Sequence, residues 1–119
     1  MKRTFVDAGV LITAARGVAE LSAAAMQVLS DPNRIFLSSL FVRLEVQPKP
    51  TYFKLTPELR FYESFFAAVR EWASPHDALT QRALTIACTF GLSAIDALHV
   101  AAAELLGADE LVTTERPCT

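Results

Sequence analysis

Residues 91–115 constrain the fold of this chain more than any other stretch. Apolar residues recur there at helical spacing between Ser93, which can cap the start of a helix, and Gly107, which can end one. Leu111 and Val112 follow and are typical of a short buried strand. A helix followed directly by a buried strand is the repeating pattern of α/β proteins, so this stretch favours that class.

Short apolar runs alternate with helical segments along the rest of the chain. The predicted strands are residues 4–6, 35–37, 71–73 and 111–112. The predicted helices are residues 9–15, 18–29, 40–46, 56–70 and 94–106, with a further helix that begins within residues 74–77 and ends at 90–91. Pro48 and Pro50 predict a loop over residues 47–56. Because strands separated by helices are joined by crossovers, we expect an α/β fold, with three α/β/α layers and a short parallel sheet of about four strands.

The composition narrows the class of protein. Of the 119 residues, 52% are hydrophobic, which is too many for a disordered chain and suits one domain with a core. The formal net charge of −2 provides no overall basic field, so any binding of nucleic acid must be local or metal-assisted. No apolar run approaches a membrane span, and the polar start does not resemble a signal peptide. We expect a cytoplasmic protein with no membrane contact.

Two further predictions concern the cysteines and the buried side of the second predicted helix. Cys88 and Cys118 lack the spacing of a metal site and do not indicate a disulfide scaffold. Cys88 lies in an apolar helical segment, where we expect a buried thiol. Leu21 and Ala24 recur at helical spacing, and we expect them on the buried side of their helix.

Four carboxylates occur where strands end or helices begin. Asp7 follows the first predicted strand and Glu115 follows the last, while Glu45 and Asp96 are predicted in early helical turns. In parallel α/β sheets these positions share the edge at which ligands bind. Carboxylates packed together repel unless a cation neutralises them, and Mg²⁺ or Mn²⁺ prefers such oxygen ligands. We therefore hypothesise that the four acids converge on a divalent ion, which can activate a water for attack on a phosphate.

Several motifs resemble the signatures of the PIN domain family, most closely its VapC-like toxin branch. They occur in the family's order, and they are FVDAGVLI at residues 5–12, LEV at 44–46, GLSAIDALHVAAA at 91–103 and GADELVTTE at 107–115. The resemblance implies a single PIN-like domain over residues 1–119 and an Mg²⁺- or Mn²⁺-dependent endoribonuclease that acts on RNA. It also implies a homodimer and a restraining antitoxin protein. By this resemblance, the family's catalytic metal site corresponds to Asp7, Glu45, Asp96 and Glu115.

The sequence departs from the family pattern in three ways. Glu115 stands where the family commonly has Asp, and its side chain is longer by about one methylene, which re-spaces the site. Ala8 stands where many members carry a small hydroxyl residue. Many members continue with a further strand or helix, whereas this sequence stops at Thr119. A truncated chain, a naturally short chain and one completed by a partner remain open alternatives.

Each acid also has an ordinary structural explanation. Asp7 can cap a helix, and Asp96 fits a capping box. Glu45 fits an exposed charge, and Glu115 fits a tail residue. Their joint occurrence at one predicted sheet edge favours the metal site over these separate explanations. His99 lies one helical turn after Asp96 and can reach the same edge, but we expect a packed or rim histidine.

A second group of residues mixes cations with aromatic side chains. Lys49, Tyr52 and Lys54 lie in the predicted loop, where RNA bases can stack beside charges that hold phosphates. Thr114 precedes the last acid and can orient it or contact a phosphate. The alternative is a loop and an amphipathic helix that bury their aromatic side chains, or a surface for a dimer or an antitoxin.

Two functions from different classes follow. The first is cleavage of RNA phosphodiesters by a metal-activated water, and the second is a catalytically weak PIN-like module that binds protein or RNA. An aspartate-based phosphotransfer domain is disfavoured, because Asp7-Ala8-Gly9 lacks the second acid of such a site. Metal binding together with cleavage would separate the first function from the second.

Overall fold

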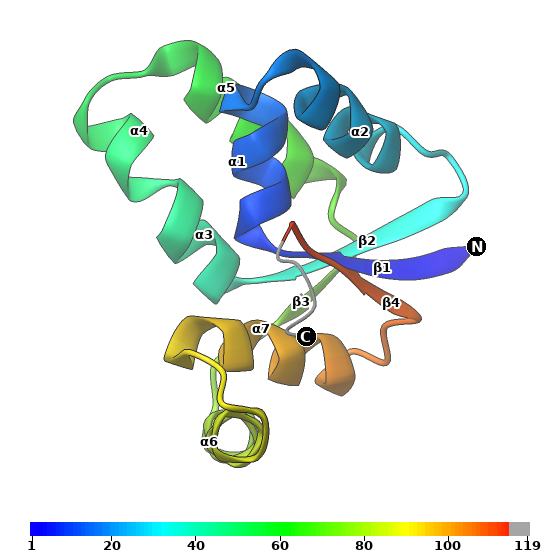
Figure 1. Cartoon of the computed structure of the whole chain (residues 1–119), viewed down its shortest axis with the longest axis vertical. Coiled ribbons are helices and arrows are strands. Elements are labelled where there is room, and N and C mark those ends of the chain that lie inside the picture. Colours follow the sequence, from blue (N-terminus) through cyan, green and yellow to red (C-terminus); the bar gives the residue numbers. More distant parts are fainter. Residues whose placement is uncertain (115–119) are drawn as a thin grey trace.

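The computed structural model describes residues 1–114, which form a four-stranded sheet covered by helices on both faces (Figure 1). All three strand pairings are parallel. The strands are β1 (Lys2–Val6), β2 (Arg34–Ser39), β3 (Glu71–Ala73) and β4 (Glu110–Val112), in the spatial order β3-β2-β1-β4. The predicted α/β fold with a short parallel sheet is confirmed.

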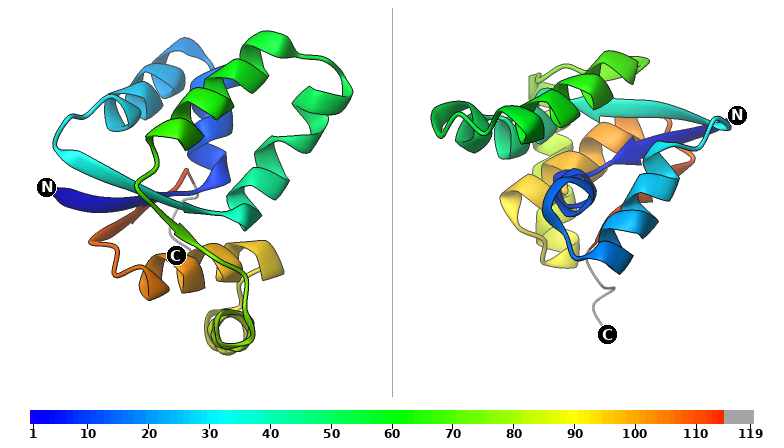
Figure 2. Two further views of the ribbon diagram at one scale, coloured as in Figure 1. Left: turned by 180° about the vertical axis from the view of Figure 1, so that it is seen from behind. Right: turned by 90° about the horizontal axis from the view of Figure 1, so that it is seen from above.

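Helices form a layer on each side of the sheet, as the two further views also show (Figure 2). One layer contains α1 (Ala8–Arg16), α2 (Ala19–Leu29), α3 (Leu40–Val46), α4 (Pro48–Tyr52) and α5 (Thr56–Ala68). On the other face α7 (Ala94–Leu105) contacts the strands, and α6 (Asp77–Phe90) packs on α7. Within residues 1–114 no single helix is long and apolar enough to cross a membrane; α6 and α7 pass that test only as a pair bent by 118°.

The core lies around the two central strands. Phe5, Val6 and Leu37 have no exposed surface. Phe5 pairs in register with Leu37 on one side and with Leu111 on the other. Strands covered on both faces are apolar where they are buried, which explains the short apolar runs at residues 5–6 in β1 and 35–37 in β2. Because all strands point the same way, their carboxyl ends and the helices that follow meet at one edge.

The predicted loop over residues 47–56 is wrong in part, because residues 48–52 form the short helix α4. Pro48 occupies its first position and Pro50 its third. The first four backbone N–H groups of a helix have no partner within that helix, so proline loses no hydrogen bond at either position. The two prolines therefore start a helix here rather than prevent one.

The predicted burial of Cys88, Leu21 and Ala24 is also wrong, since all three are exposed. Leu21 and Ala24 lie on α2, which packs mainly against α1, and Ala25 is its only buried residue. Cys88 lies on α6, whose main packing partner is α7. Each of these outer helices is covered on one narrow side, so its apolar residues extend beyond the contact.

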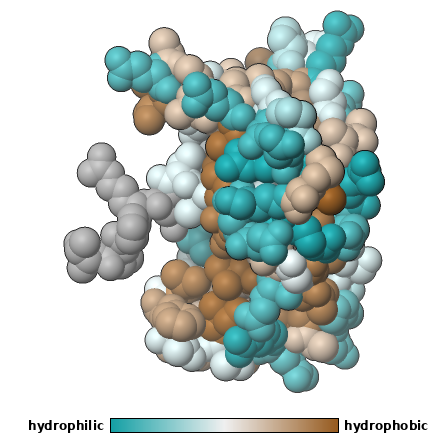
Figure 3. Space-filling model, turned by 90° about the vertical axis from the view of Figure 1, so that its right-hand side faces the viewer, coloured by the Kyte–Doolittle hydropathy of each residue, from teal (hydrophilic) through white to brown (hydrophobic). Residues whose placement is uncertain are grey.

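A charged cluster ties β1, β2 and β4 together near the amino ends of the strands. Thr4 Oγ1 donates to Glu110 Oε1 at 2.8 Å, and Arg34 Nε donates to the same oxygen at 2.9 Å. Burial favours a higher pKa for Glu110, but the hydrogen bonds from Thr4 and Arg34 outweigh it and hold this pKa below its ordinary value. Hydrophilic residues gather across this side of the molecule (Figure 3).

Replacing Glu110 with Gln is expected to lower the free energy of unfolding at neutral pH by about 1 kcal/mol. The amide keeps an acceptor for Thr4 and Arg34 but removes the negative charge. Because folding lowers the pKa of Glu110, its stabilisation is complete above the unfolded pKa and is lost as the pH falls through the folded pKa. Urea unfolding of the two proteins should therefore converge at acidic pH. A difference that persists in acid would contradict this account, and Glu63→Gln on the exposed side of α5 is the control.

Candidate functional site

Two of the four predicted acids line one cleft at the carboxyl edge of the sheet. The cleft has a volume of about 90 Å³ and lies between the ends of β1 and β4 and the start of α7. The residues that line it are Asp7, Leu92, Asp96, His99, Val100, Leu111 and Thr113. We call it the acidic cleft. Although 89 positions apart in sequence, Asp7 and Asp96 thus face the same small volume.

Asp7 is held in place at the junction of β1 and α1. Its backbone N–H donates to the carbonyl of Val112 at 3.1 Å, which extends the pairing of β1 with β4 by one residue. Its side-chain Oδ1 accepts from the backbone N–H of Val10 at 3.1 Å and so caps α1. The residue is almost completely buried. The capping explanation and a place in the acidic cleft therefore hold at the same time, because the cap uses only one carboxylate oxygen.

Asp96 reaches the acidic cleft from the first turn of α7. Its backbone N–H donates to Ser93 Oγ at 3.3 Å, so Ser93 caps this helix as predicted. The preceding helix ends at Gly91, which adopts the left-handed conformation with φ of 68°. This turn and cap fix where α7 begins, and they place the side chain of Asp96 among the residues of the cleft.

Glu45 reaches the same region through His99. It lies near the end of α3, and not in its first turn as predicted. Oε1 of Glu45 is hydrogen-bonded to Nε2 of His99, a contact that links α3 to α7. His99 is only 3% exposed, and its ring packs against Phe5 with the ring centroids 6.2 Å apart. His99 is therefore the packed residue that we expected, and it also lines the acidic cleft.

Gly9 and Thr114 meet beside Asp7, a contact that the sequence analysis missed. A methyl group on Gly9 would lie 2.5 Å from Thr114 Oγ1 and 3.3 Å from Asp7 Oδ1. Thr114, predicted as a candidate RNA-binding residue, therefore lies at the acidic edge. The signal in the sequence was a glycine near the start of a helix, two positions after a candidate ligand, where any side chain would crowd the site.

The chemistry of the acidic cleft suits a divalent cation. Two carboxylates line it, and no Lys or Arg among residues 1–114 does so. Their oxygen atoms are the donors that Mg²⁺ and Mn²⁺ prefer. In that part of the chain, however, no group of three Asp, Glu, His or Cys side chains lies close enough to hold an ion. Glu115, the fourth predicted acid, lies outside the described residues.

The predicted RNA-binding residues of the second group lie elsewhere. Lys49 and Tyr52 are on α4 and Lys54 follows it; all three are exposed, and none lines the acidic cleft. Lys54 has a φ of 56°, in the left-handed region. The three residues therefore form a surface separate from the acids.

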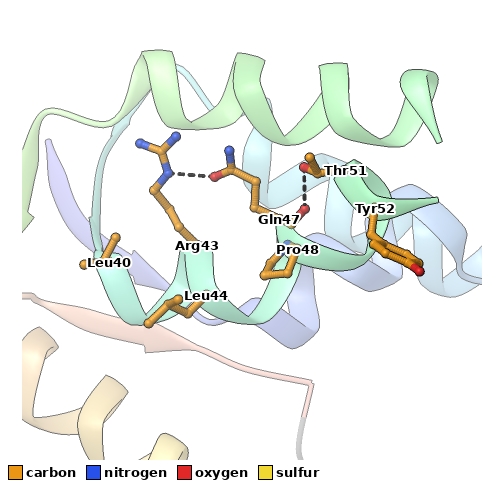
Figure 4. Close-up of a pocket in the computed structure, with 7 residues that line it drawn as sticks. All are labelled: Leu40, Arg43, Leu44, Gln47, Pro48, Thr51 and Tyr52. Carbon is orange, nitrogen blue, oxygen red and sulfur yellow. Dashed lines mark hydrogen bonds between the residues drawn. The ribbon is translucent and has the colours of Figure 1, made fainter. Parts of the chain in front are cut away.

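A larger groove runs along α3 and α4, next to these residues (Figure 4). Its volume is about 550 Å³, and it is lined by Leu40, Arg43, Leu44, Gln47, Pro48, Thr51 and Tyr52. Arg43 Nε donates to Gln47 Oε1 at 2.9 Å, and the guanidinium lies 5.1 Å from the ring centroid of Phe66. The groove contains no carboxylate, so the smaller acidic cleft remains the candidate for metal chemistry.

A comparison of the sequence with models of known protein families finds a match to one family. The sequence model of the family described as PIN domain matches residues 4–116. No curated protein sequence matches this chain.

Solved structures with the same fold include three bacterial proteins. A chain of a toxin–antitoxin complex from Klebsiella pneumoniae has a TM-score of 0.69 at 19% identity and covers 94% of this chain and 86% of its own. VapBC2 from Rickettsia felis, bound to a DNA fragment from its promoter, has a TM-score of 0.69 at 16% identity, with coverages of 95% and 88%. Mycobacterium tuberculosis VapC20, described as a toxin that cleaves the sarcin–ricin loop, has a TM-score of 0.65 at 17% identity and covers 91% of this chain and 86% of its own. At these identities the similarity shows the fold alone.

Proposed function

Because this chain belongs to the PIN domain family, we propose that it is an endoribonuclease that uses Mg²⁺ or Mn²⁺ to cleave RNA phosphodiesters. The observation that carries the proposal is the position of Asp7 and Asp96, which line one cleft from distant parts of the sequence. Two carboxylates in so small a volume repel each other, and a divalent cation between them would remove that repulsion. One of the similar structures is described as an RNA-cleaving toxin of this kind.

We assign roles to the acids as follows. Asp7 and Asp96 would hold the ion directly, Glu45 would reach it through a bound water, and Glu115 would complete the set. The ion would supply Lewis acidity, which activates a water and neutralises charge on the phosphate under attack. Asp7 would be the most rigid ligand, since its backbone and its Oδ1 are both fixed by hydrogen bonds. Thr114 would lie beside the reacting phosphate, and Lys49, Tyr52 and Lys54 would contact RNA further from the reaction.

The test is cleavage of a mixed pool of structured RNA by the purified protein. Cleavage is expected with Mg²⁺ or Mn²⁺, is expected to stop with EDTA, and should return when Mn²⁺ is added in excess. Asp77→Asn provides a matched control, because Asp77 is an exposed aspartate in the first turn of α6 and should be dispensable. Folded protein that cleaves nothing in excess metal would refute the nuclease proposal.

The second candidate is a PIN-like module that binds protein or RNA with little turnover. The observation that favours it is that residues 1–114 bring no three metal-ligating side chains into one cluster. RNA binding that persists in EDTA, without cleavage under any metal condition, would support this candidate over the nuclease.

We also propose that the protein works as a cytoplasmic homodimer restrained by an antitoxin protein. Support for the antitoxin partner comes from two of the similar structures, which are described as a toxin–antitoxin complex and as VapBC2. An antitoxin would explain how a cell that makes such a nuclease protects its own RNA.

Replacing Gly9 with Ala is expected to lower RNA cleavage about tenfold, while the free energy of unfolding changes by less than about 1 kcal/mol. Alanine favours a helix, but its methyl group would displace Thr114 and crowd Asp7. The better helix propensity of alanine and the clash with Thr114 have opposite effects on stability. The displacement of Thr114 and the crowding of Asp7 are both expected to lower cleavage. Cleavage rates and urea unfolding measure the two quantities separately.

The control for Gly9→Ala is Gly107→Ala. Gly107 has a φ of 64° and has open space around it. Alanine there should cost roughly 1–2 kcal/mol of stability, because an L-residue is strained in the left-handed region. Cleavage by the folded protein should be unchanged. Equal cleavage by wild type and Gly9→Ala would show that the close contact at Gly9 has no part in the site.

A further inference from the structure

Among the described residues, the side chain of the buried His99 makes one polar contact, which is with Glu45. The side chain is 3% exposed and packs against Phe5 in the core. Its Nδ1 is buried without a hydrogen-bond partner in the described part of the chain, and its Nε2 contacts Oε1 of Glu45. Burial of an unsatisfied polar atom is unfavourable, so an apolar side chain would suit this position better if packing were its only role.

The contact with Glu45 defines the tautomer of His99. An ionised carboxylate can only accept hydrogen bonds, so Nε2 must carry the hydrogen and donate it to Oε1. Nδ1 faces no hydrogen-bond partner among residues 1–114.

Glu45 depends on this contact for its orientation. Its side chain is partly exposed on α3, where it is free to adopt several rotamers. The hydrogen bond holds Oε1 against a residue that itself lines the acidic cleft, while Oε2 takes no part in it. A carboxylate fixed in advance loses less conformational entropy when it accepts from a water bound to an ion.

We propose that His99 is a positioning residue that holds the carboxylate of Glu45 beside the acidic cleft, where it can accept from a water on a divalent ion, and so strengthens the binding of that ion by this protein. The inference rests on the proposed function, since it requires an ion that Asp7 and Asp96 hold. It extends that function to a residue of α7 that would not touch the ion. Partners that orient metal ligands in this way commonly change metal affinity by about 10- to 100-fold.

The test compares Mn²⁺ affinity, measured by the EPR signal of free Mn²⁺, in wild type and two variants. His99→Leu fills the space without a donor and is expected to bind Mn²⁺ about 10- to 100-fold more weakly. His99→Gln can place an amide N–H near the position of Nε2 and should stay within about threefold of wild type. Thermal unfolding of each variant reports the purely structural effect. Loss of stability in both variants with unchanged Mn²⁺ affinity would overturn the inference.

The NMR spectrum of the wild-type protein gives a second readout that does not depend on any His99 variant folding. Long-range ¹H–¹⁵N correlations should show the hydrogen of His99 on Nε2, and the Nε2 resonance should move when Mg²⁺ is added. A ring with no hydrogen on Nε2 in the wild type would overturn the inference. An Nε2 resonance that does not shift at saturating Mg²⁺ would also overturn it.

Failure of the inference and failure of the proposed function give different results. If the wild type binds no Mn²⁺, the metal-dependent nuclease is refuted and the role of His99 falls with it. If the wild type binds Mn²⁺ and folded His99→Leu binds it equally well, the role of His99 alone is refuted. The coupling can be isolated in a Glu45→Gln background, where His99→Leu should no longer weaken binding.

Discussion

Replacing Asp7 with Asn is expected to lower RNA cleavage by about a thousandfold, which corresponds to roughly 4 kcal/mol of transition-state stabilisation. Asparagine has the shape of aspartate but lacks the charge that a divalent ion requires. Its side-chain oxygen can still accept from the N–H of Val10, so the cap of α1 is kept. The free energy of unfolding should therefore stay close to that of the wild type, and the loss of cleavage can be assigned to the site.

Two related variants make this prediction sharper. Asp7→Ala removes both the charge and the cap, so it should lose cleavage and also about 1 kcal/mol of stability. Asp96→Asn should lose cleavage to a similar extent as Asp7→Asn, because both acids line the same cleft. Single-turnover cleavage and urea unfolding are the measurements. Cleavage by Asp7→Asn within about tenfold of wild type would remove Asp7 from the proposed set of ligands.

Replacing Leu37 with Ala is expected to have the largest effect on stability, a loss of about 3–4 kcal/mol. Leu37 has no exposed surface and lies in β2, where it pairs in register with Phe5 and Glu71. Removal of its side chain leaves a cavity between the sheet and the helices that cover it, which neighbouring elements cannot close. Since a domain of this size is stabilised by only about 5–15 kcal/mol, much of its stability would be lost.

Thermal unfolding followed by circular dichroism measures this effect. The midpoint should fall by roughly 10–20 °C for Leu37→Ala. Leu84→Ala is the matched control, because Leu84 is 65% exposed on α6 and its truncation should change stability by less than about 0.5 kcal/mol. A cost below about 1 kcal/mol for Leu37→Ala would contradict the position of the core described above.

Strong local patterns made most of the fold predictable from sequence. The helix at residues 40–46 was predicted with the bounds that the structure gives, because a serine precedes it and apolar residues recur along it. The parallel sheet followed from apolar runs separated by helices. The errors came where the effect of a residue depends on its place in the fold. The prolines of α4 are tolerated because they fall in a first helical turn. Cys88 is exposed because its helix is covered mainly from one side.

The candidate site was predictable only in outline. Asp7 and Asp96 could be assigned to one edge because strand ends and helix starts meet there in parallel sheets. The contact between Glu45 and His99 joins residues 54 positions apart on two helices, and no spacing rule specifies it. The contact between Gly9 and Thr114 likewise depends on how β4 ends beside α1. Such side-chain contacts are set by tertiary packing, which the sequence pattern does not resolve.

The most direct test of the metal site is an anomalous difference map from crystals of the wild-type protein soaked in Mn²⁺. The account predicts one peak in the acidic cleft, within about 2.0–2.3 Å of carboxylate oxygens of both Asp7 and Asp96. It also predicts that the peak disappears in crystals of Asp96→Asn. No peak at saturating Mn²⁺, or a peak bound only by residues outside this cleft, would contradict the claim that these acids form a divalent metal site.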